Sequence, residues 1–499
     1  MTRSRAPSLA GRAFAALALL IGFYVLAVAI AAVLLYLPYA EWVYAGRLHL
    51  KLAFFCLIGA GIILWSLLPR WDRFMPPGPK IDLQRHHRLA ELVQHVSSAV
   101  QQSMPREVYV VPDVNAWVAQ RGGVLGFGSR RVMGLGLPLM ARLTATQFAA
   151  VLAHEFGHFH GGDTALGPWI YRTRAAIGRT LANLGEHSSV LQLPFEWYGN
   201  LFLRITHAIS RAQEFAADAL AARVVGSRAL VQGLKAIHGS SVGFAGFWQQ
   251  EYGPLLESGY RAPLQIGFES FMTSPVVASS VASAVAKELE TGQADPFDTH
   301  PPLRERIAAV GAETDQPGWQ DDAAALTLLD DVPALEQELL TFVVGPSNAS
   351  KLVSIAWEDV PLRVWAPMWR NVAAKNSDKL RGVTPELLTR VTPERQNLAV
   401  ALHLAARPDV ATDQHVAAAA GIFGASLATA LLDRGWQVQV APGHPVLLSR
   451  GAMQIRPFEI WSEICSGSTT QTAWRELLDA NDLAAIDLAG VAAKPTARV

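Results

Sequence analysis

The sequence contains the pentapeptide His154-Glu155-Phe156-Gly157-His158, which matches the H-E-x-x-H pattern of zinc hydrolases. Two histidines four residues apart on a helix project from one face and can bind one tetrahedral metal ion. Glu155 would then lie beside the open coordination position, where a carboxylate can accept a proton from a water that the metal activates. The pattern therefore predicts a zinc centre with a carboxylate general base.

The flanking residues predict the helix that this spacing requires. Thr144 and Gln147 have capping-box spacing, an apolar run leads into His154, and Gly161-Gly162 is expected to stop the helix. A five-residue pattern also occurs by chance, and two helical histidines are often ordinary side chains. The cap, the apolar run and the glycine stop together favour the metal site.

Zinc requires a third protein ligand, and a later segment offers one. His160 lies six residues after the first histidine, about 240° around a helix, so it is expected to face away. Thr164 stands where the metzincin pattern has its third histidine. Residues 210–218 place Glu214 and Asp218 one turn apart in an otherwise apolar helix, which favours Glu214 as the ligand. Asp218 would accept an N–H from a ligand histidine. The alternative is a solvated helix face on which Glu214 pairs with Arg211.

These two segments, H-E-F-G-H and S-R-A-Q-E-F-A-A-D, resemble the membrane-associated gluzincins that include HtpX and the CAAX prenyl endopeptidase. Two further segments are similar to the same family. They are the stretch 114–118, followed by a glycine-rich hairpin at 122–136, and the H-P segment 299–307. The resemblance covers about residues 81–310, and four motifs in the same order make a chance match improbable.

The resemblance implies a zincin-type peptidase domain that binds one Zn²⁺ per chain. His154, His158 and Glu214 would be the metal ligands, and Glu155 would be the general base and acid.

Three more residues receive roles by the same comparison. His300 would stabilise the transition-state oxyanion, unless it is only a helix-entry residue before the prolines. Arg306 would hold Asp218 or the substrate carbonyl. Asn115 would lie beside the substrate-binding edge strand, with the substrate peptide adding antiparallel to the hairpin around 130–136.

Composition and length bound the rest of the molecule. The 499 residues are too many for one core and predict two or three domains. With 42 basic and 42 acidic side chains the net charge is zero, so nucleic acid is not an expected partner. Cys56 and Cys465 lie far apart in different kinds of segment, which argues against a disulfide framework and fits a reducing compartment.

Two apolar stretches near the amino terminus predict a membrane anchor. Residues 13–37 contain no charged side chain and can cross a hydrocarbon core of ~30 Å, and residues 52–68 form a second, shorter run. The first stretch exceeds the apolar region of a signal peptide, which is the alternative. Basic residues gather before the first stretch and after the second. This distribution predicts two spans in a bacterial inner (plasma) membrane, with a cytoplasmic catalytic domain.

The predicted fold is mainly α with a small β-sheet. Residues 1–75 would form the membrane anchor, 76–80 a stiff linker, 81–314 the metallopeptidase domain, and 323–499 a C-terminal α+β accessory domain of unknown role. HtpX-like proteins carry further membrane helices where this chain has residues 164–207. Here charged residues interrupt every apolar run, so we favour a buried helical hairpin over a spanning or surface-lying segment. Residues 416–432 are expected to form a buried helix and not a third span, followed by short strands at 436–440 and 445–457.

The sequence therefore favours a membrane-anchored zinc endopeptidase of membrane protein quality control or processing. Its partners would be peptide or protein substrates, including membrane proteins, and the lipid bilayer. One alternative is a non-catalytic membrane scaffold, but such a protein need not retain Glu155. A prenyl-protein-type processing protease is the other alternative, although that relative has more than two spans. The sequence does not specify the natural substrate or the oligomeric state.

Overall fold

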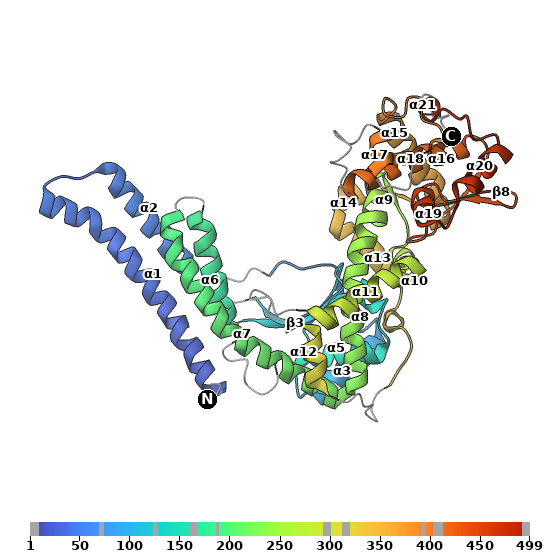
Figure 1. Cartoon of the computed structure of the whole chain (residues 1–499). Helices are drawn as coiled ribbons and strands as arrows, with labels where there is room; N and C mark the ends of the chain where they lie inside the picture. Colours follow the sequence, from blue (N-terminus) through green and yellow to red (C-terminus); the bar gives the residue numbers. More distant parts are fainter. Residues whose placement is uncertain are drawn as a thin grey trace, which may run out of the picture. The chain divides into compact units, whose positions relative to one another are not determined.

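The computed structural model describes residues 9–68, 74–122, 128–159, 167–185, 189–292, 301–311, 320–390, 396–402 and 413–491. Over these ranges the chain is mainly helical with small sheets (Figure 1). It divides into two compact units. The first comprises residues 1–241 and 282–343, and the second comprises residues 242–281 and 344–499. The chain thus leaves the first unit within helix α8 (Ser227–Phe247) and returns within α11 (Pro275–Thr291).

This division differs from the boundaries expected from the sequence, because residues 320–343 are fixed to the zinc-motif helix α5 (Ala145–Gly157). The Ala145 N–H donates to the Ala323 carbonyl at 2.8 Å, and the Asp321 N–H donates to the Thr146 hydroxyl at 2.7 Å. The 3₁₀ helix η3 (Ala325–Leu328) and helix α13 (Val332–Val344) then add buried leucines to the peptidase core. A segment that looks like the start of an accessory domain therefore completes the peptidase.

The sheet of the first unit has the strand order β1-β2-β4-β3. Strand β1 (Lys80–Ile81) pairs antiparallel with β2 (Glu107–Val111), β2 pairs parallel with β4 (Arg130–Gly136), and β4 pairs antiparallel with β3 (Ala116–Arg121). Both sides of β4 are therefore occupied. The expectation that a substrate peptide adds to residues 130–136 is wrong, because the outer strand of this sheet is β3.

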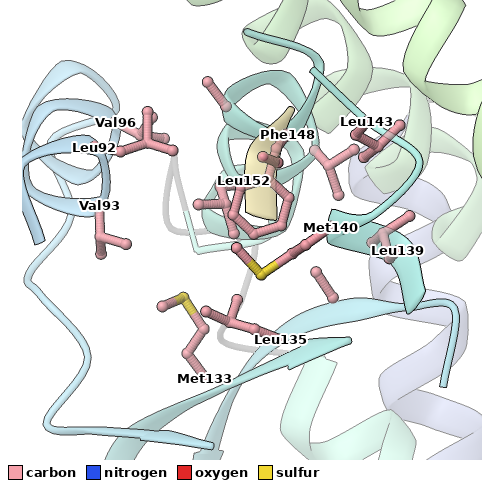
Figure 2. Packing of buried hydrophobic residues seen from close by; sticks show 14 of the residues in the cluster. Leu92, Val93, Val96, Met133, Leu135, Leu139, Met140, Leu143, Phe148 and Leu152 are labelled. Atoms are coloured by element: carbon pink, nitrogen blue, oxygen red, sulfur yellow. The ribbon is translucent and has the colours of Figure 1, made fainter. Parts of the chain in front are cut away.

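The peptidase core lies between this sheet and helices α3 (His87–Ala99), α4 (Leu137–Met140) and α5. Figure 2 shows Phe148 and Leu152 of α5, one turn apart, directed at Met140 and the strand residue Leu135. Both α5 side chains are fully buried, and each such burial stabilises the fold by ~2–3 kcal/mol. The predicted capping box starts α5. The Gln147 N–H donates to the Thr144 hydroxyl at 3.2 Å, and the Thr144 N–H donates to Gln147 Oε1 at 3.1 Å.

A separate four-helix bundle lies around the membrane anchor. Helices α1 (Leu9–Ala45) and α2 (Leu50–Leu67) are each apolar and long enough to cross a membrane, and they pack on each other. Helix α6 (Gly167–Gly185) packs against both, and helix α7 (Ser189–Val225) packs mainly against α1 (Figure 1). Their shared core includes Phe23 of α1, Ile63 of α2, Ile177 of α6 and Phe202 of α7. The helical hairpin expected at 164–207 is therefore present in its described part, and its packing partner is the membrane anchor.

The second unit is built around helix α18 (Asp413–Leu432), which meets the length and composition of a membrane span but is mostly buried inside the protein. The predicted buried helix is thus confirmed, and Gly435, at φ +79°, follows its end. A three-stranded antiparallel sheet follows, formed by β7 (Gln437–Gln439), β8 (Leu447–Arg450) and β9 (Met453–Ile455). Neither Cys56 nor Cys465 forms a disulfide in the described part of the chain.

The remaining elements of the second unit are short. They are the π-helices η2 (Trp248–Tyr252) and η5 (Pro361–Trp365), the 3₁₀ helix η4 (Trp357–Asp359), the parallel strand pair β5 (Tyr260–Arg261) and β6 (Val353–Ser354), and helices α9 (Gly253–Glu257), α10 (Leu264–Thr273), α14 (Pro346–Ala349), α15 (Ala366–Lys375), α16 (Leu387–Arg390), α17 (Gln396–Ala401), α19 (Ile460–Ser466), α20 (Gln471–Ala480) and α21 (Leu488–Val491).

Candidate metal centre

The two histidines of α5 and the first carboxylate of the α7 motif converge on one point. His154 Nε2 lies 3.4 Å from Glu214 Oε2, and His158 Nε2 lies 3.6 Å from Glu214 Oε1. The two imidazole rings are 4.8 Å apart between centroids and nearly perpendicular. Two imidazole nitrogens and one carboxylate around a common centre are the donor set of a catalytic zinc site.

A glycine in the motif permits this convergence. A Cβ atom at Gly157 would lie 3.1 Å from the Ala217 Cα and 3.3 Å from its Cβ, so α5 and α7 cross in close contact there. Because Ala217 lies between Glu214 and Asp218, this crossing sets the distance from both carboxylates to the α5 histidines. The second x residue of H-E-x-x-H, Gly157, thus contributes to the site through its small size.

A second layer of polar contacts holds the ligands. Asp218 Oδ1 lies 2.9 Å from His154 Nδ1, the ring nitrogen on the opposite side from Glu214. Arg306 of α12 (Leu303–Val310) binds Asp218 with two nitrogens, Nη2 to Oδ1 at 2.6 Å and Nε to Oδ2 at 2.8 Å. Such an arrangement fixes the tautomer and orientation of a ligand histidine.

The other ion pair at α7 separates the alternatives for Glu214. Arg211 pairs with Glu305 of α12, whereas the Glu214 residue is only 5% exposed. The solvated-face alternative, in which Arg211 pairs with Glu214, is therefore wrong. Instead Arg211 helps to attach α12, which carries Arg306.

The charges of the site are strongly coupled. Burial alone lowers the pKa of His154, but the neighbouring carboxylates of Asp218 and Glu214 reverse this effect and raise the pKa to about 9. For Asp218, burial raises the pKa, and the Arg306 and His154 contacts more than offset it, so the pKa lies below its ordinary value. The centre is thus a negative, buried environment that favours a bound cation.

Glu155 lies at the margin of this centre. Ligand atoms of His154, Glu155 and His158 lie within 4.8 Å of one another, and the Glu155 residue is partly exposed, whereas His154 is buried. Glu214 also lies within this range of both imidazoles, at 3.4 Å from His154 Nε2 and 3.6 Å from His158 Nε2. A partly exposed carboxylate beside the ligands suits proton transfer to a substrate.

Comparison with known proteins agrees with this geometry. Residues 83–314 match Peptidase family M48. The chain carries an HtpX-like M48 domain. Protease HtpX of Vibrio cholerae serotype O1 (strain M66-2) is 26% identical over 261 residues, which cover 47% of this chain and 76% of the relative. Protease HtpX of Escherichia coli (strain K12 / DH10B) is 26% identical over 284 residues, covering 50% of this chain and 82% of the relative. No solved structure matches the chain. The family resemblance inferred from the sequence is confirmed for residues 83–314, and these matches support a membrane metalloprotease.

Asn115 and His300 are the two other residues that the family resemblance assigned to the site. Asn115 is exposed and directly precedes the outer strand β3, and its carbonyl accepts the Gly136 N–H at 2.8 Å. His300 lies outside the described residues, so its role stays a prediction. Pro301 and Pro302, which follow it, are buried at the start of α12.

Sequence reasoning missed a clamp at the end of the zinc-motif helix. α5 ends at Gly157, so His158 is its C-cap residue and lies where helices fray. The next residue, Phe159, is held from two sides. The Arg131 guanidinium lies 4.6 Å from its ring centroid, and the Gln102 side chain donates to its carbonyl at 3.1 Å. Arg131 also donates to Gln102 Oε1 at 3.1 Å, which closes the clamp. No sequence pattern links positions 102, 131 and 159, because the contacts are long-range.

Proposed function

We propose that this chain is a membrane-anchored zinc endopeptidase in which Glu155 activates the attacking water. The convergence of His154, His158 and Glu214 beside Glu155 is the observation that carries the proposal. A zinc ion held by the three ligands would lower the pKa of a water and polarise the scissile carbonyl.

The protein side chains supply the proton transfers and the orientation. Glu155 accepts the proton of the attacking water and returns it to the leaving amine. Asp218 keeps His154 in the tautomer that presents Nε2 to the centre, and Arg306 holds Asp218 in place. His300 is proposed to donate to the developing oxyanion, a contact worth ~3 kcal/mol of the barrier.

The outer strand β3 is the proposed docking site for the substrate backbone. An extended peptide can pair with the free edge of a sheet, and Asn115 lies at the start of this edge. Helix α5 packs against β3, so a peptide on that edge runs beside the zinc-motif helix. Backbone pairing makes few demands on sequence, which suits a protease of many protein substrates.

The anchor defines where this activity takes place. We propose two spans, α1 and α2, with the peptidase on the cytoplasmic side, because Arg3, Arg5 and Arg12 precede α1's apolar stretch and Arg70 and Arg73 follow α2. The first turns of α7 accompany them into the bilayer. Leu193 and Trp197 in these turns are 61% and 68% exposed, which suits contact with lipid. Membrane proteins with cytoplasmic segments are therefore the proposed substrates.

Replacing Glu155 with glutamine tests this mechanism. Glutamine preserves size but cannot take up a proton, so cleavage of unfolded casein should fall by ~10²-fold or more while zinc content stays near one per chain. Glu91, an exposed carboxylate on α3, offers a matched control, since Glu91→Gln should leave both values unchanged. Casein cleavage by Glu155→Gln at the wild-type rate would refute the mechanism and revive the scaffold alternative.

A further inference from the structure

The hairpin formed by α6 and α7 contains a cavity whose lining includes a carboxylate. The cavity has a volume of about 350 Å³ and lies between the two helices. Its walls are mainly apolar, with two glycines, and its polar lining residues are Glu196 and Asn200. Glu196 is the only charged residue among those that line it in the described part of the chain.

The polar residues form a stripe along α7. Gln192, Glu196 and Asn200 follow one another at four-residue intervals, so they share one face of the helix. The Gln192 side chain donates to Glu196 Oε1 at 2.6 Å, which orients the carboxylate. Neither Gln192 nor Glu196 is fully buried, and Asn200 is exposed. This stripe remains accessible along the cavity.

Contacts between α7 and the membrane anchor indicate how deep in the bilayer this polar stripe lies. In the first turn of α7, Leu191 approaches Gly59 in the middle of α2, where a Cβ would lie 3.0 Å from the leucine methyl group. α7 and α2 both run toward the peptidase from this contact. The helix rise places Glu196 ~7 Å beyond it and the end of α2 at Leu67 ~12 Å beyond it. Glu196 thus lies close to the boundary at which α2 leaves the hydrocarbon core.

A carboxylate at this boundary can pair with the basic residues of other membrane proteins. Transmembrane helices carry Lys and Arg at their cytoplasmic ends, so a helix beside α7 presents its basic residues at the level of Glu196. The apolar walls of the cavity suit the last turn of such a helix, and Gly178, where a Cβ would meet no atom within 4 Å, lets it approach closely.

The geometry points to this cavity as the site that binds the cytoplasmic end of a substrate's transmembrane helix, with Glu196 pairing with its flanking Lys or Arg. This inference rests on the proposed function, since it concerns how substrates of that peptidase are recognised. α7 itself connects the cavity to the metal centre. From Glu196, which pairs with the basic residue, to Glu214 is 18 residues of continuous helix, or ~27 Å. An extended chain of ~8 residues covers that distance, so cleavage is expected about 7–10 residues after the basic residue.

A pair of anchored substrates tests the inference. Each carries one transmembrane helix, a flanking Lys or Glu, and an unstructured tail, and each is reconstituted with the full-length protein in phosphatidylcholine nanodiscs. Wild-type protein should cleave the Lys substrate about 10-fold faster than the Glu substrate, the usual effect of a charge-assisted hydrogen bond. Glu196→Lys should invert this preference. Glu41→Gln, at the opposite end of the anchor, is the matched control and should keep the wild-type preference.

Each outcome has a distinct meaning. An unchanged preference in Glu196→Lys, with both substrates still cut, would overturn the inference while the peptidase function stands. If wild-type protein cuts neither anchored substrate nor casein, the proposed function itself fails. If the effect of Glu196→Lys appears only when phosphatidylethanolamine is present and is the same for both substrates, the carboxylate binds a lipid amine and the inference is wrong. The cleavage position, read by mass spectrometry, should also move with the basic residue when it is shifted along the tail.

Discussion

Replacing Glu251 with glutamine is expected to remove the loss of folding stability that the second unit undergoes as the pH rises. Glu251 lies in the π-helix η2, and its carboxylate accepts the Gly443 N–H at 3.2 Å. Gly443 is fixed further by the Ser274 hydroxyl, which donates to its carbonyl at 2.6 Å. A Cβ at Gly443 would lie 2.8 Å from the Phe271 carbonyl oxygen, so the loop is pressed onto α10. The carboxylate therefore joins the inserted segment 242–281 to the C-terminal part of this unit.

Burial raises the pKa of Glu251 from 4.5 to about 7, although the Gly443 N–H opposes the shift. A native pKa above the unfolded one means that the folded unit holds the proton more tightly. Its stability is therefore fully present below about pH 4.5, falls between pH 4.5 and 7, and is constant above. At 1.36 kcal/mol per pH unit the loss would reach ~3.4 kcal/mol, and we expect ~2 kcal/mol because the side chain keeps some contact with solvent.

Hydrogen–deuterium exchange of the full chain measures this loss locally, where a global unfolding curve of a multidomain protein would not. After correction for intrinsic rates, amides of residues 248–257 should exchange ~30-fold faster at pH 8 than at pH 5 in the wild type, the equivalent of ~2 kcal/mol. Glu251→Gln should show nearly equal protection at both pH values. Glu269→Gln, an exposed change on α10, should behave like the wild type. Equal wild-type protection at both pH values, or a Glu251→Gln protein that keeps the wild-type dependence, would refute the reasoning.

Three further outcomes are expected. Glu214→Ala should lower zinc affinity by at least ~10²-fold in a chelator competition, because a three-ligand site loses one donor; full occupancy would exclude α7 from the site. Arg131→Ala should weaken zinc binding ~10-fold, because it releases the end of α5, and Arg131→Lys should restore part of the affinity. Arg130→Ala changes the other face of the strand and should leave zinc binding unchanged. Equal effects of both alanine variants would contradict the clamp. A reporter fused after Lys80 should lie in the cytoplasm and one inserted near Ala45 on the opposite side, and the reverse labelling would invert the proposed topology.

Local spacing made the α5 part of the site predictable. The capping box at Thr144 and Gln147 and the i, i+4 histidines depend only on neighbours in sequence, so the pattern fixes both the helix and the face. The same holds for Glu214 and Asp218 on α7. The distance between the two helices was not predictable, because it depends on Gly157 and Ala217 meeting across the crossing.

Features that depend on pairing between distant segments were missed. The sequence of 130–136 reads as one arm of a hairpin, but only the parallel partner β2, in register from Glu107 to Val111, makes β4 an inner strand. The α6–α7 hairpin looked too charged for a membrane neighbour. Its charged residues interrupt the sequence but not the face that meets the anchor, where Ile177 and Phe202 are buried.

Helix α7 links the membrane anchor to the peptidase core within the first unit. Near the start of α7, the Tyr198 hydroxyl donates to the Leu19 carbonyl of α1. Gly22 permits this approach, because a side chain at that position would collide with the hydroxyl oxygen of Tyr198. Near its end, Ala217 packs on Gly157 and sets Glu214 against the histidines. The helix is unbroken between these points, so the proposed metal ligand Glu214 lies at a fixed distance from the anchor. If a flexible tether alone joined the peptidase to the anchor, the distance of the active site from the membrane would vary. Continuity of α7 would therefore provide the physical basis for the proposed cleavage at a set distance from the membrane.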